Sequence, residues 1–122
     1  MSIGAQAYAR TAQTTASPRD IEAQALLKAA RKLQDVMTNW ATTDEGLEDA
    51  LMFNRKLWSI FLGDAMSEEN QQPLEVRQNI ANIGVFILTQ CAALKLKPEV
   101  DKLQSLIDIN RNIAAGLSGR AA

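Results

Sequence analysis

The chain has 122 residues, 47% of them hydrophobic and 22% charged, and its formal net charge is −1. This length suits one domain with a modest core, and this composition is typical of a folded chain and excludes a disordered one. Because acidic and basic residues nearly cancel, the chain lacks the basic field that drives phosphate binding. We therefore do not expect it to bind nucleic acid directly.

The sequence contains no histidine, and Cys91 is its only cysteine. The commonest general base and metal ligand are therefore missing, and no disulfide can form within the chain. Cys91 lies in an apolar helical run, where a buried packing residue is expected and a reactive thiol is not. Acidic pairs lie at predicted helix starts or in a loop, and no nucleotide-binding or hydrolase motif occurs. We expect no catalytic residues, no metal, no cofactor and no enzyme activity.

Residues 1–16 carry a single charge, at Arg10, and little apolar bulk beyond Ile3 and Tyr8. Their alanines and glutamines permit a short helix, which we expect to form a detachable N-terminal arm. This segment has no apolar core of the signal-peptide type. The longest apolar run, Ile80–Leu88, is about half the ~20 residues needed to cross a bilayer. These features predict a cytoplasmic protein without a membrane span.

The first long helix is predicted to begin at Ser17–Asp20, where the serine can cap the helix and Pro18 suits its first position. Apolar side chains then recur at steps of three and four residues over about 24 residues, the pattern of one buried helix face. That face comprises Leu26, Ala30, Leu33, Val36, Met37 and Trp40. Lys28, Arg31 and Lys32 lie on the opposite face.

The second helix is predicted to begin at the capping-box pattern Thr42–Glu45, which places acidic residues at the positive end of the helix dipole. Gly63 is its predicted stop, ahead of a polar loop. Its apolar side comprises Leu47, Leu51, Asn54, Trp58, Phe61 and Leu62. An amide on such an apolar side is unusual and calls for an explanation.

The third helix is predicted over Pro73–Leu94 and the fourth over Pro98–Ala115. The third is apolar nearly all round over Ile80–Leu88, so we expect it to be the central and most buried helix. Gly84 within it costs about 1 kcal/mol relative to alanine, which a close approach of two helices explains better than contact with a ligand. Short loops favour antiparallel neighbours.

The predicted fold class is therefore all-α. We expect an antiparallel four-helix bundle over residues 17–122, preceded by the short helical arm of residues 1–16. The bundle is expected to form a single domain.

The aromatic residues of the second helix suggest a surface for another protein. Trp58 and Phe61 share one face, whereas Phe53 lies off the buried stripe beside Met52. An exposed Met–Phe pair next to Arg55 suits contact with an apolar helix of a partner. Contact with the N-terminal arm explains the pair equally well.

A longer pattern, AL-x-x-NR-x-LW-x-x-F, comprises Ala50, Leu51, Asn54, Arg55, Leu57, Trp58 and Phe61. It resembles the signature of the FlaF family of flagellar biosynthesis regulators. The resemblance continues into Pro73–Leu74, Arg77 and Ile83–Gly84, and upstream it takes in Tyr8 and Thr15–Ala23. Val76 and Gln78–Asn79 depart from the more leucine-rich turn typical of the family, at the surface of the third helix.

The resemblance implies a small non-enzymatic protein that supports flagellin production and secretion late in flagellum assembly. It also implies work alongside FlbT, a second small regulator linked to flagellin messenger RNA. The polymerising ends of flagellin are amphipathic helices, and a helix-binding groove can cover them before export, as a chaperone does. The predicted partner-binding residues are Asn54, Arg55, Trp58, Phe61, Arg77 and Phe53, with Trp58 as the main contact and the two arginines beside the groove.

Two alternatives stay open. Asn54 and Arg55 can instead hold the second helix against the third, without meeting a partner. The function can instead be post-transcriptional regulation of flagellin translation, exerted on the transcript or through FlbT. The net charge argues against direct contact with RNA, although Lys28, Arg31 and Lys32 form a small basic patch.

Overall fold

The computed structural model describes residues 18–40 and 45–119. These residues form four α-helices and a short 3-10 helix: α2 (Pro18–Thr38), α3 (Glu45–Met66), α4 (Leu74–Leu96), η1 (Val100–Lys102) and α5 (Leu103–Leu117). No strand occurs in this part of the chain, and the predicted all-α class is confirmed. The predicted N-terminal arm, the caps at Ser17 and Thr42–Asp44, and the domain boundary after residue 16 lie outside the described residues.

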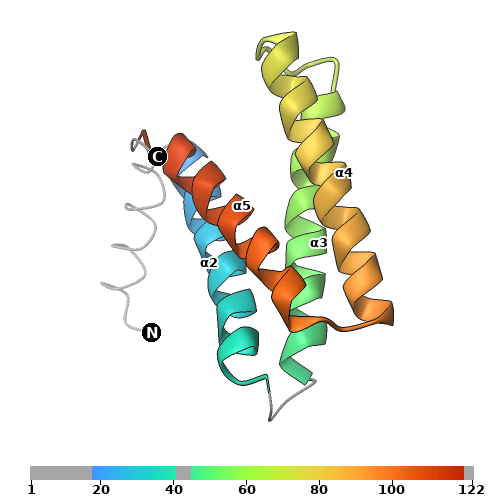
Figure 1. Ribbon diagram of the computed structural model, residues 1–122. Coiled ribbons are helices and arrows are strands. Elements are labelled where there is room, and N and C mark those ends of the chain that lie inside the picture. Colours follow the sequence, from blue (N-terminus) through green and yellow to red (C-terminus); the bar gives the residue numbers. More distant parts are fainter. Residues whose placement is uncertain (1–17, 41–44, 120–122) are drawn as a thin grey trace, which may run out of the picture.

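Successive helices run in opposite directions, as the antiparallel prediction requires (Figure 1). α2 packs most extensively against α5, and α3 against α4, while contacts between α2 and α3 join the two pairs. The pairs diverge toward the end at which α2 begins and α5 ends (Figure 1). The bundle is thus two helix pairs that spread apart at one end.

One apolar core joins the four helices of the described chain. The stripe predicted for the first helix is the inner face of α2, on which Leu26, Ala30, Leu33 and Val36 are buried and Met37 lies at the edge. α5 contributes Leu103, Leu106 and Ile107, none of which has exposed surface. Burial of each leucine or isoleucine contributes about 1.5–3 kcal/mol.

The prediction that the third helix is central and most buried is wrong. α4 packs chiefly against α3, and its buried residues are Gly84, Ile87, Cys91 and Leu94. The other side of the helix is exposed, to 55% at Val85 and 89% at Leu96. A helix that is apolar all round has no polar face to mark its outer side, so the sequence pattern cannot reveal this orientation.

α4 is also the one helix within residues 18–40 and 45–119 that is long and apolar enough to cross a membrane. Only the length and composition of α4 meet this criterion, and core helices of folded proteins also meet it. A count of uninterrupted apolar residues overlooks the helix because Asn79, Asn82 and Gln90 divide its apolar run.

Gly63 does not end the second helix, contrary to prediction, since α3 continues to Met66. The carbonyl groups of Ala65 and of Ser67, just past the end of the helix, receive hydrogen bonds from the side chain of Arg77 on α4, which supports the additional turn. By contrast, Gly119 follows α5 with a φ of 71°, as expected of a glycine that releases a helix end.

Gly84 permits a close approach of α3 and α4. A Cβ atom at this position would lie 3.3 Å from Cβ of Leu62 and 3.7 Å from Cε3 of Trp58. Such a separation is tighter than most carbon contacts, so a side chain here would push the helices apart. The prediction that Gly84 serves helix packing is confirmed.

Candidate functional site

A cleft of about 250 Å³ opens between the two helix pairs where they diverge. Each of the four α-helices contributes to it, together with the loop between α3 and α4. Its apolar lining consists of Trp58, Phe61, Ala65, Val76, Ile80, Ile113 and Leu117. Its charged lining consists of Arg19, Glu22, Asp64 and Arg77. The cleft therefore combines an apolar floor with charged edges.

Trp58 and Phe61 form the aromatic part of this floor. Their rings meet edge to face, with centroids 5.2 Å apart and an interplanar angle of 84°, an arrangement that the quadrupoles of aromatic rings favour. Trp58 has no exposed surface, whereas Phe61 is half-buried. Phe61 therefore has surface that a partner can contact, and the buried Trp58 packs against Phe61 beneath that surface.

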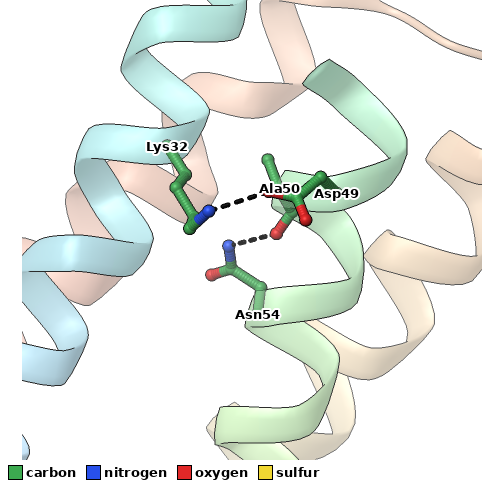
Figure 2. Close-up of polar contacts among 4 residues, drawn as sticks. All are labelled: Lys32, Asp49, Ala50 and Asn54. Carbon is green, nitrogen blue, oxygen red and sulfur yellow. Dashed lines mark hydrogen bonds and ion pairs between the residues drawn. The ribbon is translucent and has the colours of Figure 1, made fainter. Parts of the chain in front are cut away.

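A buried chain of hydrogen bonds holds Trp58 in place. Its Nε1 donates to Oδ1 of Asn110 at 2.8 Å, and Nδ2 of Asn110 donates to Oδ1 of Asn54 at 2.7 Å. Nδ2 of Asn54 donates in turn to the carbonyl oxygen of Ala50 at 2.9 Å (Figure 2). Both amides have no exposed surface, so the apolar environment strengthens each bond and makes its loss costly.

This chain of bonds explains the amide on the apolar side of the second helix. Of the two interpretations of Asn54, contact between helices of this protein fits its position better than contact with a partner. The hydrogen bonds of Asn54, however, join α3 to α5 and not to α4 as expected. Because Asn54 and Trp58 are fully buried, neither can touch a partner directly in this conformation. Any contribution they make to binding acts through the shape of the cleft, and their role in binding stays a prediction.

Arg55 lies away from the cleft. It is exposed and lines a shallow hollow with Met52 and Ile60. Residues three before and three after Trp58 lie about 120° apart around the helix axis, so Arg55 and Phe61 point in different directions. The structure does not bring Arg55 and Arg77 to the two sides of one groove.

Arg77 lines the cleft but its guanidinium has a structural partner. Nε donates to the carbonyl oxygen of Ala65 at 2.8 Å, and Nη2 donates to that of Ser67 at 3.0 Å. Ala65 lies in the last turn of α3, whose carbonyl groups the helix leaves unpaired, and Ser67 follows the last residue of the helix. A cation at this end also suits the helix dipole. Arg77 therefore caps the C-terminal end of α3 and holds this part of the cleft lining in place.

Phe53 lies outside the cleft, half-buried on the side of α3 that faces α2. The Nζ atoms of Lys28 and Lys32 lie 5.3 Å and 5.4 Å from its ring centroid. Lys32 also forms an ion pair of 2.8 Å with Asp49 on α3 (Figure 2). Phe53 thus belongs to the α2–α3 junction, and its predicted alternative contact, the N-terminal arm, lies outside the described residues.

Two carboxylates of the cleft were not singled out by the sequence analysis. Glu22 lies on α2 and is half-buried, and Asp64 lies on α3 and is exposed. Burial raises the pKa of Glu22, the charge of Asp64 raises it further, and Arg19 lowers it. These acids come together because α2 packs beside α3. A single acidic residue on a helix surface does not by itself indicate a binding site in the sequence.

Cys91 is fully buried, and burial raises the pKa of its thiol to about 11, with Arg55 acting weakly in the opposite direction. The prediction of a buried packing residue is confirmed, and the raised pKa disfavours the thiolate, which is the reactive form. Within the described ranges, no group of three or more metal-binding side chains occurs.

Comparison with known proteins gives one result. Residues 4–117 match the family described as flagellar protein FlaF. No curated protein and no solved structure matches the chain. The family match extends over most of the chain and includes all four helices that build the cleft, and we conclude that this protein belongs to the FlaF family of flagellar proteins.

Proposed function

We propose that this protein is a non-enzymatic binding module of flagellum biogenesis that works in the cytoplasm and supports flagellin production and secretion. In this proposal it acts as an export chaperone, and one amphipathic helix of flagellin enters the cleft between the helix pairs. Membership of the FlaF family supports the flagellar role. The single observation that carries the binding role is the open, apolar cleft at the divergent end of the bundle.

The dimensions of the cleft suit side chains of a helix better than a small molecule. Its volume of about 250 Å³ lies below the ~300–1,000 Å³ of most ligand pockets. Its apolar lining comes from α3, α4 and α5, and α2 adds the charged Arg19 and Glu22, so a few apolar side chains entering from one face of a partner helix would contact three helices. This is the helix-in-groove mode of recognition.

The walls of the cleft are fixed before a partner arrives. The buried bonds of Asn110 hold Trp58 from behind, and Arg77 holds the end of α3. A preformed wall lowers the entropy that binding would otherwise cost. The predicted partner-binding residues therefore act in two ways: Phe61 by contact, and Trp58, Asn54 and Arg77 by positioning.

The experiment is co-purification of untagged flagellin with this protein. Flagellin with its C-terminal helix should co-purify, and flagellin without that helix should not. Equal recovery of both forms would exclude that helix as the ligand, and recovery of neither would count against the chaperone role.

The alternative, regulation of flagellin translation on the transcript, has weaker support. Of its basic patch, Lys32 pairs with Asp49, and Lys28 and Lys32 lie over Phe53. These contacts reduce the charge available to phosphate groups. A salt-dependent gel shift of the transcript, lost when Lys28, Arg31 and Lys32 are neutralised, would favour this alternative, and a shift that requires FlbT would favour its indirect form.

A further inference from the structure

The cleft has two acidic residues on different helices, and no cation among the described residues forms an ion pair with either. Glu22 from α2 and Asp64 from α3 both line it. Among the described residues, neither side chain forms a hydrogen bond or an ion pair. Carboxylates beside an apolar floor are favourable sites for an incoming cation, because the apolar wall strengthens the attraction.

Among the described residues, neither arginine of the cleft forms an ion pair with these acids. The guanidinium of Arg77 keeps its charge but is held by the carbonyl oxygens of Ala65 and Ser67. Arg19 is exposed at the start of α2, and its effect on Glu22 is smaller than the combined effects of burial and Asp64, so the pKa of Glu22 is raised. Within the described residues, Glu22 therefore has no paired cation.

We infer that the cleft selects a partner helix that carries a lysine or arginine beside its apolar side, with the cation held between Glu22 and Asp64. The apolar stem of such a side chain can lie along Phe61 and Leu117 while its charged end reaches the carboxylates. This inference rests on the proposed function and specifies the chemistry of the segment that the cleft receives.

A divalent metal ion is a poorer occupant of the same place. Calcium takes six to eight oxygen ligands and magnesium about six, whereas no group of three acidic, cysteine or histidine side chains occurs in the described residues. Two carboxylates on separate helices suit a single basic side chain better.

The test uses the full-length protein and three synthetic amphipathic peptides of about 18 residues, a length that spans the bundle as a helix. The peptides share a leucine stripe and differ at one flanking position, which is lysine, glutamine or glutamate. Isothermal titration compares wild type, Glu22→Gln, Asp64→Asn and the double variant. Asp101→Asn serves as the matched control, because Asp101 is an exposed acid of η1 outside the cleft. Flagellin is titrated into the same proteins.

Wild type should bind the lysine peptide most tightly and the glutamate peptide least tightly. Glu22→Gln and Asp64→Asn should each weaken lysine-peptide binding by about two- to fivefold, the range of partly exposed ion pairs. The double variant should bind the three peptides alike, and Asp101→Asn should behave as wild type. The preference for lysine should also decrease in high salt.

The outcomes separate this inference from the proposed function. If wild type binds the three peptides alike, or binds none of them, the inference is wrong, whether or not flagellin binds. If the lysine preference is present and depends on the two acids while flagellin does not bind, the inference stands and the flagellin proposal fails.

Discussion

Nε1 of Trp58 donates a hydrogen bond of 2.8 Å to Oδ1 of Asn110, and neither side chain has exposed surface. The bond joins α3 to α5, so it connects the two helix pairs. The same amide of Asn110 donates to Asn54, which makes Asn110 the centre of the buried polar chain. This relationship positions the aromatic floor of the cleft.

The first prediction concerns this centre. Asn110→Ala leaves both Nε1 of Trp58 and Oδ1 of Asn54 unpaired, whereas Asn54→Ala leaves only one donor of Asn110 unpaired. Since each buried unpaired group costs about 1–3 kcal/mol, Asn110→Ala should lower the free energy of unfolding by about 2–6 kcal/mol and Asn54→Ala by about half as much. Urea unfolding followed by circular dichroism measures both, and a larger loss for Asn54→Ala would show that Asn110 is not the centre.

The second prediction concerns Glu22 and pH. Its pKa is raised above the unfolded value of 4.5, so the folded protein binds more protons than the unfolded chain, and stability falls as pH rises through this range. Glu22→Gln removes that penalty and should raise the melting temperature at pH 7. The difference should disappear below pH 4.5, where wild-type Glu22 is protonated in both states.

Thermal unfolding of wild type and Glu22→Gln at pH 7 and near pH 4 measures the effect. Asp101→Asn, which removes the same charge from an exposed position outside the cleft, should change stability by no more than about 0.5 kcal/mol. A variant less stable than wild type at pH 7 would mean that Glu22 is compensated in the free protein. Stabilisation together with weaker binding would mark Glu22 as a residue kept for function.

The third prediction compares two helical glycines. Gly84→Leu must displace Leu62 or Trp58, because a Cβ atom there already approaches Leu62 to 3.3 Å, and it should cost about 1–3 kcal/mol. Gly63→Ala meets no atom within 4 Å and should stabilise α3 by up to about 1 kcal/mol through helix propensity. Chemical denaturation checks both. Equal effects of the two changes would contradict the close approach at Gly84.

The fourth prediction separates the two arginines. Arg77→Met removes both hydrogen bonds to the end of α3 and should cost about 2 kcal/mol, as expected for charged hydrogen bonds. Arg55→Ala removes an exposed side chain and should change stability by no more than about 0.5 kcal/mol. Melting temperatures are to be measured beside flagellin binding. A folded Arg55→Ala protein that fails to bind would assign Arg55 to a second contact surface outside the cleft.

The sequence predicts the helices whose two faces differ in polarity. The inner side of α2 follows from leucines at helical spacing opposite Lys28 and Arg31, and this side is the buried one in the structure. Gly84 could also be interpreted in advance, because a glycine that weakens a helix usually permits a contact. The orientation of α4 could not be predicted from the sequence. Val85 and Ile87 are equally apolar, and only the fold exposes the valine and buries the isoleucine.

The cleft itself could not be predicted from local patterns. It exists because two helix pairs diverge, and its acids, Glu22 and Asp64, come from separate helices. The pattern around Asn54 and Trp58 lies on the segment of α3 that contributes Trp58 and Phe61 to the cleft. It could not show that these side chains face inward, since the bonding partner of Trp58 is Asn110 on α5.

The most direct test of the account uses a substitution that fills the cleft. Gly116 lines it, and a Cβ atom there meets nothing within 4 Å, so Gly116→Phe should fold and place a ring in the partner's space. Gly63 is likewise open but does not line the cleft, so Gly63→Phe is the matched control. In a titration with flagellin, we expect Gly63→Phe to bind as wild type does and Gly116→Phe to lose at least about tenfold in affinity, equivalent to about 1.4 kcal/mol. Equal, wild-type affinity of both folded variants would contradict the claim that the cleft is where this protein binds its partner.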